Sequence, residues 1–171
     1  MQIRDGTVRI RAPLHTTDAE IRLFLDRHRR WLDKHMQEAQ ALAQAKAGLH
    51  RLTREEIREL AEKAGKVIPE RAAYWARVIG VDYGRITIRC QKTRWGSCSA
   101  KGNLNFNCLL MLTPPDVMDS IVVHELCHRK EMNHSARFYA EVLKAMPEYR
   151  QKQKWLKDHG EMILAMAQDD R

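Results

Sequence analysis

The amino-acid sequence predicts an α+β fold in which a small, mostly antiparallel sheet packs on helices. Residues 18–46, 54–79 and 116–159 repeat apolar side chains at helical spacing, whereas residues 82–112 largely alternate apolar and polar side chains, as strands do. The chain has 171 residues, of which 44% are hydrophobic, so it is long enough to bury a core.

The N-terminal part, residues 1–50, is expected to form a hairpin followed by a long helix. Two short strands would meet at Asp5-Gly6, a dipeptide that favours a two-residue hairpin turn. Thr17 and Glu20 have the spacing of a capping box, which predicts the start of a helix over residues 18–46.

The remainder, residues 51–171, is expected to hold the functional core and to form one compact unit with the N-terminal part. A second capping box at Thr53 begins a helix that Pro69 should kink and Gly80 should end. Two strands, GRITIRCQ and LNFNCLLML, are predicted to pair as a hairpin over residues 85–112.

Three helices are predicted after this hairpin. Pro114 and Pro115 suit the first turn of a helix that runs to His128. Ser135 can cap the next helix, and the last helix is expected to end at Gly160.

The segment IVVHELCHRKEMNH, residues 121–134, predicts a metal site. His124 and His128 are four residues apart, so on a helix they project from one face and can hold one ion. Glu125 is turned away from that face and suits a general base. His134 is the best third ligand if the chain turns back at Met132-Asn133, and the alternatives are Glu141 and Glu148 on the following helix.

Two motifs, TRWGSCSAKGNLNFN and VVHELCHRKEMNHSARFYAEV, closely resemble the YgjP-like metallopeptidase family, which is related to the SprT-like and WLM zinc-dependent proteases of the zincin group. The resemblance implies a minimal zincin-like fold with the zinc metallohydrolase core in residues 51–171. It also implies one Zn²⁺ held by His124, His128 and His134, with Glu125 as the catalytic residue.

The most favoured function is therefore a metallopeptidase in which a zinc-bound water, activated by Glu125, attacks a peptide carbonyl. Its substrate would be a peptide or protein. Leu104–Asn107 is expected to be an exposed edge strand that pairs with the substrate through Asn105 and Phe106. Arg94 and Trp95 are further candidates for substrate contact, although both also suit structural roles.

Three alternatives remain open. Residues 72–111 carry six basic residues and one acidic residue, so the same metal site could hydrolyse a nucleotide phosphoanhydride. The basic residues of interest are Arg85, Arg89, Lys92, Arg94 and Lys101. The basic stretch could instead serve a DNA-associated, SprT-like protease. A structural zinc module would need a fourth ligand, for which only Cys127 is near.

The chain shows neither an apolar run long enough to cross a bilayer nor an apolar export signal at its N-terminus. We therefore expect a cytoplasmic protein with no membrane partner, whose four cysteines are reduced thiols.

Overall fold

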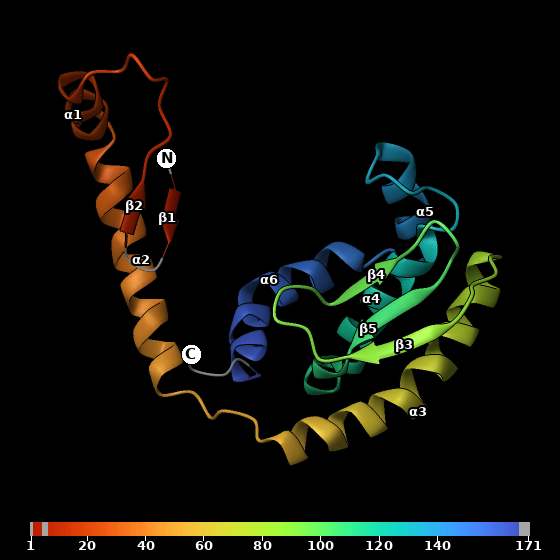
Figure 1. Ribbon diagram of the computed structural model, residues 1–171. Coiled ribbons are helices and arrows are strands. Elements are labelled where there is room, and N and C mark those ends of the chain that lie inside the picture. Colours follow the sequence, from red (N-terminus) through yellow and green to blue (C-terminus); the bar gives the residue numbers. More distant parts are fainter. Residues whose placement is uncertain (1, 5–6, 168–171) are drawn as a thin grey trace. The chain divides into compact units, whose positions relative to one another are not determined.

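The computed structural model describes residues 2–4 and 7–167 (Figure 1). The chain divides into two compact units, Met1–Leu49 and His50–Arg171, and each is described by itself. In the described part of the chain, no helix is long and apolar enough to cross a membrane.

In its described residues, 2–4 and 7–49, the first unit contains two strands and two helices. Its elements are β1 (Gln2–Arg4), β2 (Thr7–Arg9), α1 (Asp18–Arg27) and α2 (Arg29–Ala47). The strands pair antiparallel as predicted, while the Asp5-Gly6 turn lies outside the described residues. Thr17 and Glu20 form the predicted capping box. The prediction of a single long helix over residues 18–46 is wrong. His28 leaves helical geometry, with φ −105° and ψ 13°, and separates α1 from α2.

The second unit holds a three-stranded sheet. Its strands are β3 (Ile86–Arg89), β4 (Gly96–Cys98) and β5 (Leu104–Asn107), in the spatial order β3-β5-β4. The α+β class is confirmed, and the sheet is mixed, because β5 pairs parallel with β3 and antiparallel with β4. The predicted hairpin of the two longer strands is therefore wrong. The short β4, inside the segment predicted as a loop, supplies the antiparallel partner.

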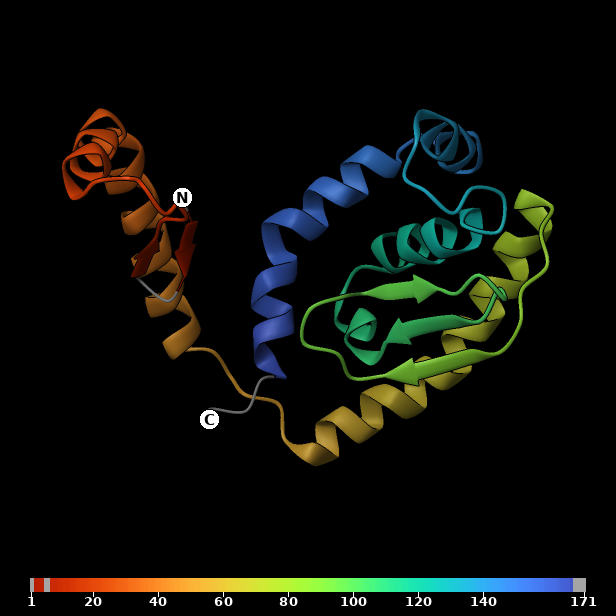
Figure 2. The ribbon, with the colours of Figure 1, turned by 45° about the horizontal axis from the view of Figure 1, so that its top comes forward.

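Two long helices, α3 (Arg54–Ile79) and α4 (Pro115–Cys127), pack on each other and on the sheet (Figure 2). A capping box starts α3, Pro69 lies inside it, and Gly80 ends it with a left-handed φ of 75°. Between β5 and α4 the chain forms a short 3₁₀ helix, Cys108–Leu112, where the sequence predicted more strand. The largest fully buried side chains of this core include Ile68, Leu104, Phe106, Leu126 and Phe138.

The C-terminal helices are α5 (Ala136–Ala145), which Ser135 caps as predicted, and α6 (Tyr149–Met166). Helix α6 continues past Gly160, so the predicted end there is wrong. Gly160 has a packing role instead, because a Cβ at this position would lie 3.2 Å from the Trp95 indole. The absence of that Cβ lets Trp95, next to β4, pack against α6.

Helix α4 is buried on nearly all sides, which explains its uninterrupted apolar run before the histidines. Two of its buried polar residues, Asp119 and Ser120, have hydrogen-bond partners, and burial without a partner is costly. The Ser120 hydroxyl donates to the Val117 carbonyl at 2.7 Å, and Arg71 of α3 forms a two-point ion pair with Asp119 that includes an Nε–Oδ1 distance of 2.8 Å. These contacts fix α4 in the core and place its C-terminal end at the candidate site.

Candidate active site

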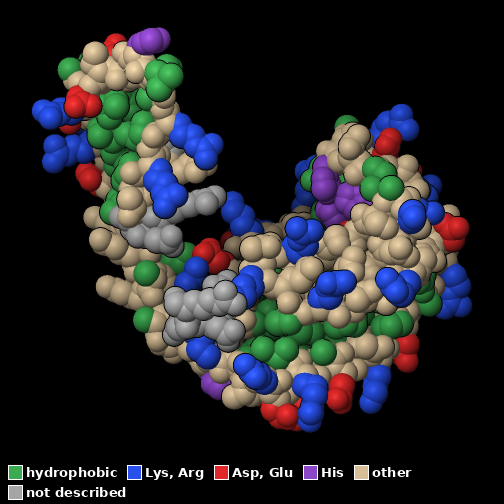
Figure 3. Space-filling view, viewed as in Figure 1, with side chains coloured by type: hydrophobic (Ala, Val, Ile, Leu, Met, Phe, Trp, Pro, Cys, Tyr) green, Lys and Arg blue, Asp and Glu red, His purple; other side chains and the backbone are tan. Residues whose placement is uncertain are grey.

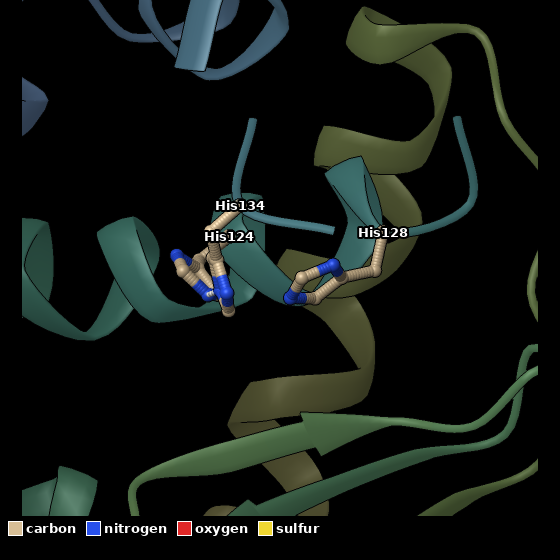
Figure 4. A group of neighbouring side chains, drawn as sticks. All are labelled: His124, His128 and His134. Atoms are coloured by element: carbon tan, nitrogen blue, oxygen red, sulfur yellow. Dashed lines mark hydrogen bonds between the residues drawn. The ribbon is translucent and has the colours of Figure 1, made fainter. Parts of the chain in front are cut away.

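Three histidines meet where α4 ends. His124 lies in the last turn of α4, His128 is its C-cap, and His134 comes from the loop before α5. The Nε2 atoms of His124 and His134 are 2.9 Å apart, and the three residues each offer a ring nitrogen within 4.8 Å of the others. Figure 4 shows the rings directed toward one another. The helix ends at Cys127, earlier than the break predicted at Met132-Asn133, and turns from there to Ser135 return the chain to the site.

Two contacts orient the rings of the helix histidines. Nδ1 of His124 lies 2.7 Å from the phenol oxygen of Tyr149, and Nδ1 of His128 lies 3.1 Å from the backbone oxygen of Glu131. A carbonyl can only accept, so His128 carries its proton on Nδ1 and leaves Nε2 as a free lone pair. The Tyr149 oxygen can hold His124 in the same tautomer. Such outer contacts are typical of histidines that bind metals.

Burial favours the neutral form of the two helix histidines, His124 and His128. It lowers the pKa of His124 to about 3, with a further contribution from the neighbouring His128 and His134. Burial also lowers the pKa of His128, which is 8% exposed. The Phe138 ring packs against all three imidazoles, with ring centroids 4.6 to 4.9 Å apart. Neutral imidazole is the form that binds a metal, so this environment favours the ligand state.

Glu125 is 6% exposed, and burial raises the pKa of its carboxyl to about 8, partly offset by the nearby Arg94 guanidinium. Strand β4 passes directly over this carboxyl. A Cβ at residue 96 would lie 2.7 Å from Oε1 of Glu125 and 2.8 Å from its Cγ. Only glycine at this position lets the backbone of β4 come so close to Glu125. This close contact explains why the RWGSC segment has a glycine there.

The donor set suits a metal ion of the zinc type. Three imidazole nitrogens converge, and no fourth protein ligand joins them among the described residues. Catalytic zinc sites also use three protein ligands. The alternative ligands do not join them. Glu141 pairs with Lys130 at 2.6 Å, Glu148 is an exposed N-cap, and the buried Cys127 is not part of the cluster.

The predicted substrate residues are placed differently from expectation. Strand β5 is central and paired on both sides, so its assignment as the exposed edge is wrong. Phe106 is 1% exposed and belongs to the core, and Asn105 donates from Nδ2 to the Ser97 hydroxyl at 3.2 Å. Trp95 is half-buried against α6, whereas Arg94 is exposed and near Glu125.

A buried carboxylate lies next in sequence to the first of three converging imidazoles, at the end of a core helix, and this arrangement suits a metal ion with a general base. The chain belongs to the YgjP-like family, since the model of the YgjP-like metallopeptidase domain matches residues 1–58 and 43–159. The family predicted from the RWGSC and HELCH segments is therefore confirmed. Membership of a metallopeptidase family implies a metal, and His124, His128 and His134 could hold it.

Two solved structures are similar to the chain. The metallopeptidase zymogen abylysin of Pyrococcus abyssi is 22% identical, with 54% of this chain and 94% of that chain covered and a TM-score of 0.49. The zymogen jannalysin of Methanocaldococcus jannaschii is 20% identical, with 54% and 96% covered and a TM-score of 0.48. No curated protein matched the sequence significantly.

Sequence reasoning missed three contributors to the site: Tyr149, Gly96 and the Glu131 backbone. Tyr149 directly follows Glu148, which was considered as a possible metal ligand. A tyrosine that contacts a metal-binding histidine has no characteristic sequence spacing from it, so the motif did not indicate Tyr149. Gly96 stood in a conspicuous motif, yet its contact with Glu125 joins residues 29 positions apart. The contact between the Glu131 backbone carbonyl and His128 does not depend on which side chain residue 131 carries. The identity of that residue could therefore not have indicated the contact.

Proposed function

We propose that the protein is a zinc-dependent metallopeptidase that binds one Zn²⁺ through His124, His128 and His134. Support comes from the three converging imidazoles and from the metallopeptidase family. Zinc in such a site supplies a Lewis acid that polarises a carbonyl and makes water more acidic.

Glu125 is the proposed general base. Its carboxylate takes a proton from the attacking water and later returns it to the leaving amine. In the metal-free protein burial favours the neutral carboxylic acid, whereas a nearby dication favours the carboxylate that the base needs. His124 and His128 are held in place by Tyr149 and the Glu131 carbonyl, so they need little reorganisation.

The outer edge of β4 beside Glu125, which has no strand partner among the described residues, is the observation that carries the peptide assignment. The Asn107 and Ser99 amides donate to the Trp95 and Asn103 carbonyls, both at 2.9 Å, so the odd-numbered residues 95 to 99 face β5. In an antiparallel pair the intervening residues face outward, so Gly96 and Cys98 present their backbone groups to the other side. An extended peptide can pair with this edge and lie across the carboxyl of Glu125.

No comparable observation favours nucleotide hydrolysis or a nucleic-acid partner. Arg85 and Arg89 lie at strand β3, on the opposite side of the sheet from β4. Of the basic residues considered, Arg94 is the one that acts on Glu125. A basic cradle for phosphates at the histidines is therefore not supported.

The test is hydrolysis of denatured casein and of a nucleoside triphosphate panel by zinc-loaded protein. Wild type should cleave casein alone. Glu125→Gln should keep zinc by elemental analysis and lose cleavage, and His134→Ala should lose zinc. Glu141→Gln is the matched control, since its side chain pairs with Lys130 away from the cluster. Casein cleavage by Glu125→Gln at the wild-type rate would refute the assignment.

A further inference from the structure

A cavity of about 380 Å³ lies between helices α5 and α6. Tyr139 and Leu143, one turn apart, line it from α5, and Tyr149, Arg150 and Gln153 line it from α6. Its volume lies in the range of pockets that bind small groups. The lining contains one charged residue, Arg150, so any charge in the cavity is positive.

The cavity adjoins the histidine cluster. Tyr149, which forms one wall, is 2.7 Å through its oxygen from His124, and the Tyr139 ring centroid lies 6.3 Å from that of His134. Figure 3 shows histidine side chains reaching the surface at one end of this unit beside an apolar patch. A peptide whose scissile bond is at the histidines can therefore place a neighbouring side chain between these two tyrosines.

The polar groups of the cavity indicate which side chain fits. The buried amide nitrogen of Gln153 has no hydrogen-bond partner among residues 2–4 and 7–167. An unpaired buried donor is costly, and rotation of the Gln153 side chain toward the cavity that it lines would let a ligand oxygen satisfy this donor. Arg150 is exposed, adds a positive charge and disfavours a cationic ligand. The tyrosine rings and Leu143 suit an apolar stem.

We propose that this cavity is a specificity pocket for a substrate glutamate next to the scissile bond, with its stem between Tyr139 and Tyr149 and its carboxylate at Gln153 and Arg150. The inference rests on the proposed peptidase function. It deepens that function, because the pocket would select acidic over basic peptides. It also gives Tyr149 two contacts, one with His124 and one with the substrate.

The experiment compares cleavage of matched peptides with Glu, Gln, Leu or Lys on either side of the scissile bond. Wild type should cleave the glutamate peptide with a kcat/KM about 10-fold above that of the leucine peptide at one of the two positions, as expected when a polar pocket loses its partner. Gln153→Leu should reduce this preference, because Arg150 then remains as the single partner of the carboxylate. Arg150→Gln should weaken cleavage of the glutamate peptide and spare the glutamine peptide. Gln151→Leu, exposed on the same helix, is the matched control and should keep the wild-type profile.

A second readout separates this inference from the peptidase assignment. Calorimetric titration of zinc-loaded Glu125→Gln with the same peptides measures binding without cleavage. The glutamate peptide should bind more tightly than the others, and by a smaller margin when Gln153 is also replaced. Cleavage with equal rates for all four peptides, or with a preference that Gln153→Leu leaves undiminished, would overturn the pocket and leave the peptidase function intact. Glutamate-selective binding without any cleavage by wild type would support the pocket and refute the peptidase function.

Discussion

Replacing Glu125 with glutamine should stabilise the metal-free protein, and more so as the pH rises. Burial raises the pKa of this carboxyl from 4.5 to about 8. Between these values the native state holds a proton that the unfolded chain has released, so the free energy of unfolding falls as the pH rises through this window. Glutamine is neutral at every pH in this window, so the Glu125→Gln variant does not lose free energy of unfolding in this way. The stability difference between Glu125→Gln and wild type should therefore grow from about 1 kcal/mol at pH 5 to about 4 kcal/mol at pH 8.

The assay is urea unfolding of chelator-treated protein at pH 5, 6, 7 and 8, followed by tryptophan fluorescence. Trp75, Trp95 and Trp155 report on the second unit. His124 contributes the opposite trend, because its pKa is lowered to about 3 and the stability from its neutral form is lost as the pH falls below about 6.5. That contribution is the same in both proteins and cancels in the difference. An offset that is equal at pH 5 and pH 8 would show that Glu125 is not buried as described.

Three further substitutions test the contacts around the site. Tyr149→Phe removes the oxygen that supports the first motif histidine and should weaken zinc affinity 10- to 100-fold in a chelator competition, while an unchanged affinity would show that the contact is dispensable. Gly96→Ala should keep the fold by circular dichroism yet lose most activity, because the added Cβ collides with Glu125; wild-type activity would contradict that close approach. Arg71→Met leaves the carboxylate of Asp119 unpaired in α4 and should lower the free energy of unfolding by about 2 kcal/mol, a loss that Arg71→Met with Asp119→Asn should partly recover.

Local patterns in the sequence predicted the helices well because caps and apolar spacing act over a few residues. Thr17, Thr53 and Ser135 all cap helices as expected. The errors concern interactions between distant segments. Gly160 was interpreted as a helix end, but its lack of a side chain serves Trp95, a contact that no local pattern encodes.

The sheet shows the same limit. Alternation identified β3 and β5 but carries no information on the direction of pairing, and three residues of β4 are too few for a period. That short strand then turned out to be the edge beside Glu125. At the site itself, His124 and His128 could be paired from helical geometry alone, and placing His134 beside them needed a turn that the sequence permits but does not specify.

Helix α6 touches the site and its surroundings at three separate levels. Tyr149 supports His124, Gln153 lines the cavity one turn later, and Gly160 receives the indole that precedes β4. Residues 149 and 160 are about 16 Å apart along the axis, so this one helix positions the residue that contacts His124, the cavity and the residue that precedes β4. A displacement of α6 along its axis would misalign all three together. Function should thus be more sensitive to changes that move this helix than to equally destabilising changes elsewhere in the core.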